Sequence, residues 1–314
     1  MNKISLLLHG AYAGNAYEEI FAAIDNSSLR KKNNLEIINV VYKADYKKTC
    51  KKLQKIGRSA DDVKYVCVKD LVNPGFYNVN RQIYTVRSGL AVINKDRFVI
   101  KLRNDQWISF NKLLLFLDKT NWLNSSERKI ITTNCYTRKD RLYHPSDMFL
   151  CGGQPDLQQY YSLPLRKETF IDLQMREVEL AKYGTKEEWL TKFECPENIL
   201  CKHYLKEKGW HLANTLSDSY TAINKFFWVV NSWNIDYRWN KKRNPVLNAG
   251  TIILPCIYDM SPFLGAPVEH ARCYMAEDFD GYRRTVKDKW FETLSKVVWK
   301  FNLDIKPNLI ADGG

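Results

Sequence analysis

The first 135 residues alternate short apolar runs with amphipathic segments, and this order constrains the fold more than any other feature. Buried strands of a parallel sheet read as short apolar runs, and the connecting helices carry apolar residues three and four positions apart. Repeated strand and helix signals predict a doubly wound α/β fold with a mostly parallel sheet flanked by helices. Strands are predicted at 4–9, 35–42, 63–68, 97–105 and 129–135, and helices at 16–24, 45–56, 78–90 and 111–118.

The fourth predicted strand ends in charge. Because side chains alternate along a strand, Lys101, Arg103 and Asp105 are expected on one face and Ile100 and Leu102 on the other. Unpaired buried charge is costly, and open α/β sheets bind ligands at the carboxyl ends of their strands. A phosphate-bearing ligand at this point is one interpretation. The alternative is a surface ion pair between Arg103 and Asp105.

The helix before that strand is a second candidate for phosphate binding. Asn78 or Asn80 is predicted to cap it, with Arg81 beside the free backbone N–H groups of the first turn. These groups and the helix dipole favour an anion at this end. An ordinary capped amphipathic helix is the competing interpretation.

The loop after the first strand begins at Gly10. It has neither the G-x-G-x-x-G spacing of dinucleotide-binding turns nor the Lys-Ser/Thr of a P-loop, so neither fingerprint is present. Contact between Gly10 and a nucleotide base is one hypothesis, and a plain tight turn is the other.

The segment 134–147 is dense in polar side chains that suit a polar substrate. Pro145 restricts His144 to an extended conformation, so the imidazole is expected to project from a loop. Arg138, Arg141 and Asp147 accompany it. The alternative is a solvated, charged turn whose last residues cap a following helix.

Charge and cysteine content limit the classes of partner. A formal charge of +13 and a pI of about 9.2 favour phosphates, nucleic acids or an anionic membrane surface. The eight cysteines lack paired metal-ligand spacing, which indicates reduced thiols rather than a zinc site.

The second half reads as more helical, with its clearest helices at 187–193, 196–208 and 288–301. The segment 283–301 is basic and amphipathic, so it either packs on the protein or lies on an anionic membrane. Residues 226–233 are aromatic and predicted to be core. Apolar runs are too short to span a membrane, and no leader is read at the start. We expect a cytoplasmic location, with peripheral attachment to the inner face of the membrane.

Six motifs, in this order, resemble the WavE-like lipopolysaccharide-synthesis family of bacterial glycosyltransferases over roughly residues 4–205. No single motif is specific, but their order is. The last third of the chain carries no pattern that can be placed. The motifs are Asn80-Arg-Gln-Ile, Ser88-Gly-Leu90, Lys101-Leu-Arg-Asn-Asp105, Asn134-Cys-Tyr-Thr-Arg138, His144-Pro-Ser-Asp147 and Pro196-Glu197.

The resemblance implies a GT-A-like, Rossmann-type fold. Residues 1–125 would bind a nucleotide-sugar donor, and residues 126–314 would form a more helical half that binds the acceptor, a glycan or lipid-linked glycan. The implied activity is sugar transfer in the synthesis of lipopolysaccharide, capsule or another surface glycan. A sugar-phosphate transferase and a basic nucleic-acid-binding protein are the alternatives. Charge is spread along the chain rather than gathered in a recognised module, so nucleic acid is not expected as a partner.

The resemblance also raises the question of a metal ion. In GT-A enzymes this strand usually ends in Asp-x-Asp, which holds a divalent ion against the donor diphosphate, and here Arg103 stands at the first Asp. Mg²⁺ or Mn²⁺ could bind through Asp105 and the phosphates, with His144 or Asp147 as a second protein ligand. Alternatively, the guanidinium neutralises the diphosphate itself.

Site residues follow from the two requirements of glycosyl transfer, which are stabilising the leaving diphosphate and removing a proton from the acceptor. Glu197 resembles the base of inverting GT-A enzymes, with Asp147 in reserve; the alternative for Glu197 is an acid in the first turn of a helix. Arg138 and His144 are expected at the acceptor. The expected donor-binding residues are Gly10, Asn80, Arg81, Lys101, Arg103 and Asp105.

Overall fold

The structure is a computed structural model that describes residues 2–59, 61–125 and 128–239, with the single positions 286, 289 and 293. The predicted helix at 288–301 and the basic segment 283–301 fall outside the described residues apart from those positions. The statements that follow concern the described part of the chain.

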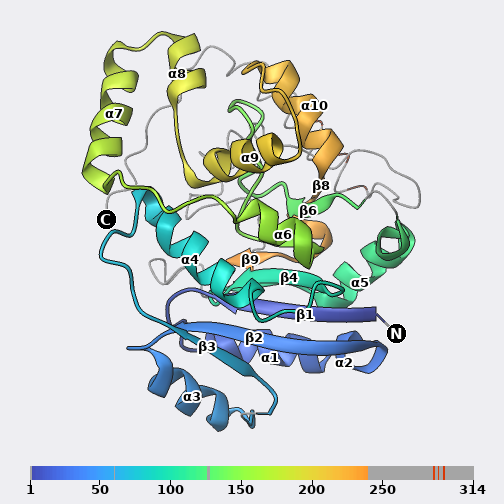
Figure 1. Ribbon diagram of the computed structural model, residues 1–314. Helices are drawn as coiled ribbons and strands as arrows, with labels where there is room; N and C mark the ends of the chain where they lie inside the picture. Colours follow the sequence, from blue (N-terminus) through green and yellow to red (C-terminus); the bar gives the residue numbers. More distant parts are fainter. Residues whose placement is uncertain are drawn as a thin grey trace.

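A seven-stranded sheet forms the centre of the protein (Figure 1). The strand order is β3-β2-β1-β4-β7-β6-β8, and all pairs are parallel except those of β7 with β4 and β6. This mixed α/β architecture with a mostly parallel sheet confirms the predicted fold class. The strands are β1 (Asn2–His9), β2 (Asn33–Tyr42), β3 (Lys64–Val68), β4 (Phe98–Arg103), β6 (Ile130–Thr133), β7 (Leu150–Gly153) and β8 (Phe227–Val230).

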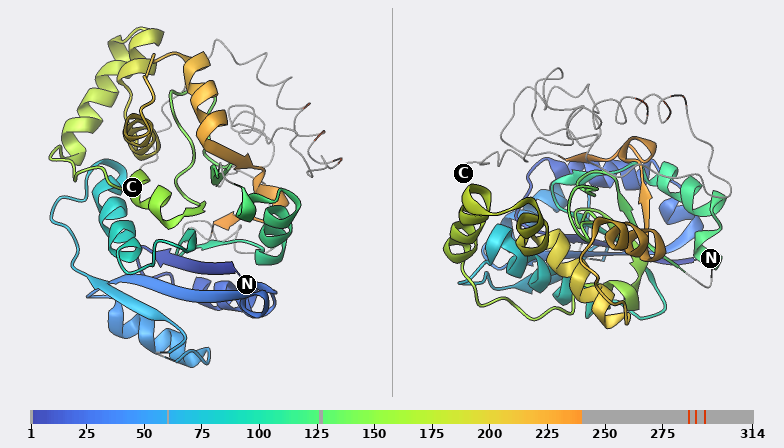
Figure 2. Two further views of the ribbon diagram at one scale, coloured as in Figure 1. Left: turned by 45° about the vertical axis from the view of Figure 1, so that its right-hand side comes forward. Right: turned by 90° about the horizontal axis from the view of Figure 1, so that it is seen from above.

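Helices cover both faces of this sheet, and each face has its own apolar cluster. The first face packs against α1 (Ala16–Asp25), α2 (Leu29–Lys32), α3 (Tyr46–Lys55) and α5 (Phe110–Lys119). The second packs against α4 (Val79–Leu90), α6 (Gln154–Tyr160), α9 (Pro196–Glu207) and α10 (Leu216–Phe226). Figure 2 shows α7 (Phe170–Tyr183) and α8 (Lys186–Lys192) beyond α9, at the end of the molecule opposite α3.

Smaller elements complete the described part. β5 (Gln106–Trp107) and β9 (Arg238–Trp239) form a separate two-stranded antiparallel sheet. Three short 3₁₀ turns lie at Phe76–Asn78, Trp122–Asn124 and Ser232–Asn234.

Strand β4 alternates as its sequence predicts. Ile100 and Leu102 belong to the cluster on the first face, while Val99 belongs to the second. Lys101 shares the face of Val99 and is fully buried, so an ammonium group lies beneath α6 and α9 where apolar residues would be usual. Such a group persists only where hydrogen bonds or opposite charges offset its desolvation.

Helix α4 packs closely on the centre of the sheet because of Gly89. A Cβ atom at this position would overlap Leu7 Cδ1 on β1 and lie 2.8 Å from Val40 Cγ2 on β2. Any larger residue would therefore push the helix away. The close contact at Gly89 therefore sets the distance between α4 and the sheet.

The predicted elements of the first 135 residues are present, with ends shifted by a few residues. Six elements of the second half were not predicted: β7, α6, α7, α10, β8 and β9. β7 is only four residues long and reads Leu-Cys-Gly-Gly, which lacks the apolar run of a strand. It also follows the loop that ends at residue 147, so the alternative in which that loop caps a helix is wrong.

Strands β6, β7 and β8 extend the sheet across the expected boundary at residue 125. The division into a donor half and an acceptor half stays a prediction. Among the described residues, no helix has the length and apolar character needed to cross a membrane.

Candidate active site

The parallel strands β1 to β4 end at one edge of the sheet. His9 and Arg103 are register partners at the ends of β1 and β4, and Tyr42 pairs with Val68 at the ends of β2 and β3. Helix α4 begins at the same edge because it follows β3. Loops at this edge thus bring together segments that lie far apart in the sequence.

Arg103 and Asp105 form an ion pair. This pair was one of the two interpretations of the charged end of the fourth predicted strand. Arg103 Nε lies 3.1 Å from Asp105 Oδ1, and Nη2 lies 2.9 Å from Oδ2. The two side chains remain 41% and 23% exposed. The turn that carries Asp105 is held by Asn104, whose Nδ2 donates to the Gly10 carbonyl at 3.1 Å. Gly10 therefore supports this turn through its backbone.

The start of α4 differs from its prediction. Asn78 adopts a left-handed conformation (φ 61°) at the N-cap position, and its side chain does not cap the helix. Arg81 forms a bidentate pair with Asp70, with Nε–Oδ1 at 2.7 Å and Nη2–Oδ2 at 2.6 Å. The guanidinium stays half-exposed at the sheet edge.

Asn80 supports a loop rather than facing the edge. Its side chain is 1% exposed. Its Nδ2 donates to the Arg166 carbonyl at 2.8 Å, and its Oδ1 accepts from the Arg166 N–H at 2.7 Å. These bonds tie the start of α4 to the segment that leads into α7. The prediction that Asn78 or Asn80 caps the helix is wrong, because both side chains are used in other hydrogen bonds.

Lys101 lies between the sheet edge and the loop 138–147. Its Nζ donates to the Asp147 carbonyl and, at 3.1 Å, to the Met148 carbonyl. Burial lowers the pKa of this ammonium to about 8, while the carboxylates of Asp147, Asp105 and Glu197 act in the opposite direction. Lys101 thus interacts electrostatically with Asp105, which follows β4, and with Asp147 and Glu197 at the other end of the site.

The loop 138–147 is closed by its own side chains. Arg138 Nε and Nη2 each lie 2.8 Å from an oxygen of Asp140, and the Arg138 N–H donates to the His144 carbonyl at 2.9 Å. The structure therefore brings Arg138 and His144 together, but it uses the buried guanidinium to shape the loop.

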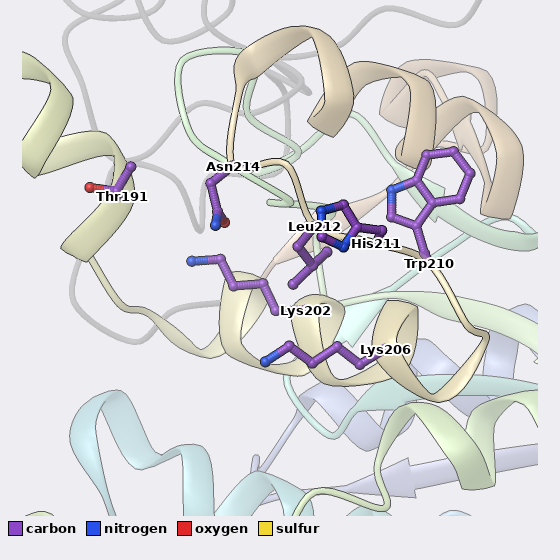
Figure 3. A pocket seen from close by; sticks show the side chains of 7 residues that line it. All are labelled: Thr191, Lys202, Lys206, Trp210, His211, Leu212 and Asn214. Carbon is purple, nitrogen blue, oxygen red and sulfur yellow. The ribbon is translucent and has the colours of Figure 1, made fainter.

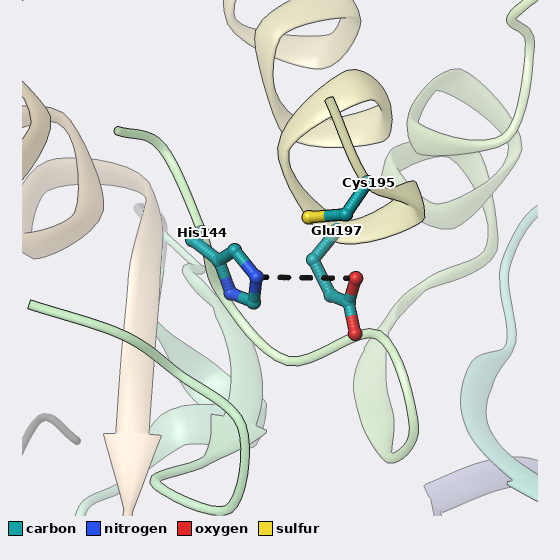
Figure 4. A group of neighbouring side chains, drawn as sticks. All are labelled: His144, Cys195 and Glu197. Atoms are coloured by element: carbon teal, nitrogen blue, oxygen red, sulfur yellow. Dashed lines mark ion pairs between the residues drawn. The ribbon is translucent and has the colours of Figure 1, made fainter. Parts of the chain in front are cut away.

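His144 projects from this loop toward the first turn of α9 (Figure 4). Its Nδ1 lies 2.9 Å from the Tyr136 carbonyl, which only accepts, so Nδ1 carries the hydrogen. Nε2 then faces Glu197 Oε2 at 4.0 Å. Burial, followed by the charges of Arg141 and Arg138, holds the pKa of His144 well below its usual value, so the ring is neutral.

Glu197 sits in the first turn of α9, where the backbone turns after Pro196. The carboxyl is only 16% exposed. Burial raises its pKa to about 7, and the nearby charge of Asp147 adds to the shift. Asp147 is 5% exposed and accepts a hydrogen bond from Gln82 Nε2 of α4 at 2.7 Å. The two candidate acids therefore share one buried neighbourhood.

One group in the described residues has the composition of a metal site. Potential ligand atoms of His144, Cys195 and Glu197 all lie within 4.8 Å of one another. Imidazole and thiolate suit zinc, whereas Mg²⁺ and Mn²⁺ prefer oxygen ligands. This group therefore does not match the ions expected at Asp105, and Asp105 belongs to no such group in the described chain.

Sequence reasoning missed several residues at this site. The sequence predicts Cys195 only as a reduced thiol, and it assigns Gln82, a member of the Asn80-Arg-Gln-Ile motif, no role in the site. Arg141 was noted, but not its stacking on Phe193, with the guanidinium 4.5 Å from the ring centre. These contacts join segments that lie far apart in the sequence, so only the folded structure reveals them.

A model of the family described as WavE lipopolysaccharide synthesis matches residues 60–228, more than half of the chain. The chain belongs to this family. The matched region contains α4, β4, the loop 138–147 and α9, and so includes every site residue described above except Gly10. No curated protein matches this WavE-family chain.

Solved structures similar to this WavE-family chain share little sequence with it. Mouse xyloside xylosyltransferase 1 is 10% identical with a TM-score of 0.39, over 73% of this chain and 86% of that one. S. aureus TarS 1–349 is 11% identical with a TM-score of 0.36, over 71% and 80%. The mannosyltransferase PcManGT from Pyrobaculum calidifontis, in complex with GDP-Man and Mn²⁺, is 12% identical with a TM-score of 0.33, over 71% and 74%.

Proposed function

We propose that this protein is a GT-A-like, inverting glycosyltransferase. It would transfer a sugar from a nucleotide-sugar donor to a glycan or lipid-linked glycan in lipopolysaccharide or other surface-glycan synthesis. The observation that carries the proposal is the Glu197 carboxyl, buried opposite His144 and close to Asp147, with a pKa raised to about 7. Membership of the WavE family supports the pathway.

The donor diphosphate is assigned to the sheet edge at Arg103. Two guanidinium nitrogens of Arg103 already bind two carboxylate oxygens, and a phosphate presents the same bidentate geometry. Asp105 would then hold Mg²⁺ or Mn²⁺ together with the phosphates. Arg81, at the start of α4, adds a second half-exposed cation for the donor.

The acceptor is assigned to the side of Glu197. The ionised carboxylate takes the proton of an acceptor hydroxyl while that oxygen forms a bond to the anomeric carbon. The bond between this carbon and the diphosphate oxygen breaks, and the nucleoside diphosphate leaves with the electron pair. A base with a pKa of about 7 is well matched to this step near neutral pH.

Lys101 is assigned a positioning role. Its hydrogen bonds to the Asp147 and Met148 carbonyls join β4 to the loop that presents His144. The donor edge and the acceptor side are therefore held at a fixed separation, which group transfer requires.

A peripheral location at the inner face of the membrane is also part of the proposal. The charge of +13 supports it, because an anionic surface attracts a cationic protein. Co-sedimentation with anionic vesicles at low salt, lost at physiological salt, is the expected result. Failure to sediment at low salt would reject this location.

The experiment that tests the function is a thermal-shift screen of the purified chain against UDP-, GDP-, CMP- and TDP-sugars. A ligand that binds only the folded state raises the melting temperature with its concentration. The shift should be lost in Arg103→Ala and retained in Arg30→Ala, because Arg30 is paired with Asp62 outside the assigned site. The protein should also slowly hydrolyse the nucleotide sugar that it uses as donor. If no nucleotide sugar stabilises the protein, the proposed function is rejected.

A further inference from the structure

A cavity of about 480 Å³ lies between α8, α9 and the loop that joins α9 to α10 (Figure 3). Its size falls within the range of small-ligand sites. Lys202 and Lys206 extend into it from one side of α9, while Trp210, His211 and Asn214 line it from the loop. Its lining contains two ammonium groups and no carboxylate.

The two lysines have no ion-pair partner among the described residues. The acid that acts most strongly on Lys202 is Glu194, but Arg166 already holds that carboxylate at 3.0 Å. Burial lowers the pKa of the half-buried Lys202. A partly desolvated, unpaired ammonium gains more from an anionic ligand than a fully hydrated one does.

Trp210 supplies an aromatic surface with an unused donor. Its Nε1–H is buried and has no hydrogen-bond partner in the described part of the chain. The ring is fixed by an edge contact with Phe226, at 5.7 Å between ring centres, and its backbone N–H donates to the Leu205 carbonyl at 2.9 Å. A rigid indole beside two cations suits a ligand with both an apolar face and an anionic group.

The cavity shares its supporting segments with the candidate active site. Helix α9 carries Glu197 at its start and Lys202 further along. On the opposite wall, the Asn214 N–H donates to the Tyr143 hydroxyl at 2.9 Å, and Tyr143 directly precedes His144. The Tyr143 hydroxyl in turn donates to the Asp218 carboxylate at the start of α10. A ligand in this cavity would therefore contact the helix that carries Glu197 and a loop bonded to the residue before His144.

We propose that the cavity is an acceptor subsite for an anionic sugar, a saccharide unit that carries a carboxylate or a phosphate. The inference deepens the proposed function by naming the acceptor chemistry, and it rests on that function. The ammonium groups of Lys202 and Lys206 bind the anionic group. The ring of Trp210 packs against the sugar face.

Isothermal titration of the full chain with glucose 6-phosphate, glucuronic acid, glucose and inorganic phosphate tests the subsite. The two anionic sugars should bind, and glucose should bind about 10-fold more weakly or worse because it lacks the charge-assisted bonds. Phosphate alone should be weaker than glucose 6-phosphate because it offers no face to Trp210. Equal binding of glucose, equal binding of free phosphate, or no binding of either anionic sugar would overturn the proposal.

Two variants locate the binding. Lys202→Gln combined with Lys206→Gln should weaken binding of glucose 6-phosphate about 10-fold or more. The matched control, Lys192→Gln with Lys208→Gln, removes two charges that are paired with Glu188 and Asp156, and should bind normally. If the first variant does not fold, Thr191→Glu places a carboxylate at an exposed position of the cavity and should also abolish binding. Unchanged affinity in the folded variants would place the ligand elsewhere.

The isothermal titrations contain no donor and do not depend on turnover. A negative titration therefore rejects the subsite alone, whereas normal turnover of a Glu197→Gln enzyme would reject the catalytic assignment alone.

Discussion

His144 and Glu197 face each other across the interface between the loop 138–147 and α9, with Nε2 and Oε2 4.0 Å apart. The Tyr136 carbonyl fixes the imidazole hydrogen on Nδ1, so a neutral, accepting nitrogen points toward the carboxyl. Because burial holds the pKa of His144 well below its usual value, a proton taken up by Glu197, whose pKa is raised to about 7, stays on the carboxyl. This relationship motivates the first two predictions.

Replacing Glu197 by Gln should remove the chemical step and spare the donor. We expect kcat to fall by about 10²–10⁴-fold, as for other general bases, while donor affinity stays within about twofold. Single-turnover kinetics and donor titration measure the two effects separately. Glu207→Gln, at the exposed far end of the same helix, is the matched control and should turn over normally. Near-normal turnover in Glu197→Gln would transfer the role to Asp147.

Activity should rise with pH through about 7, because only the ionised Glu197 accepts a proton and its pKa is raised to about 7. The same shift has a consequence for stability. The ordinary pKa of 4.5 is raised on folding, so the folded state holds the proton more tightly, and stability falls as pH rises from about 4.5 past 7. Melting temperatures at pH 5 and pH 8 should show this loss in the wild type and less of it in Glu197→Gln. Equal losses in both proteins would contradict it.

Asp105→Asn should weaken donor binding. Donor affinity should also no longer depend on a divalent ion, because an amide is a poorer metal ligand than a carboxylate. Donor affinity measured with MnCl₂ and with EDTA gives the metal dependence. Glu168→Gln is the control, since Arg166 and Glu168 form a similar bidentate pair two residues apart, and it should behave as wild type. If wild-type affinity is the same in MnCl₂ and EDTA, Arg103 alone neutralises the diphosphate.

Gly89→Ala should destabilise the protein by about 1–3 kcal/mol, because the added methyl meets the buried side chains of Leu7 and Val40. This cost exceeds the gain of up to about 1 kcal/mol in helix propensity. Ser88→Ala, one residue earlier on α4, should change stability by less than about 0.5 kcal/mol. Urea unfolding of both variants measures the difference, and equal stabilities would show that α4 can move away from the sheet.

The first half of the chain was the more predictable part because its signals are local. Alternating apolar and polar positions place Lys101 opposite Ile100 and Leu102 whatever the rest of the protein does. Pro145 likewise fixes the extended backbone of His144 by local sterics. In contrast, β7 carries no strand signal of its own, since its Leu-Cys-Gly-Gly segment is held by pairing with β4 and β6 on either side.

The sequence by itself determined the α/β class, the family resemblance and the residue types available for phosphate and proton chemistry. The tertiary structure alone decided which of them meet. It paired Arg103 with Asp105, used Asn80 and Arg138 to hold loops, and buried Lys101 against carbonyls of the loop 138–147. The physical reason is that burial, hydrogen-bond partners and pKa depend on what packs around a side chain, and α9 reaches His144 only when the chain is folded.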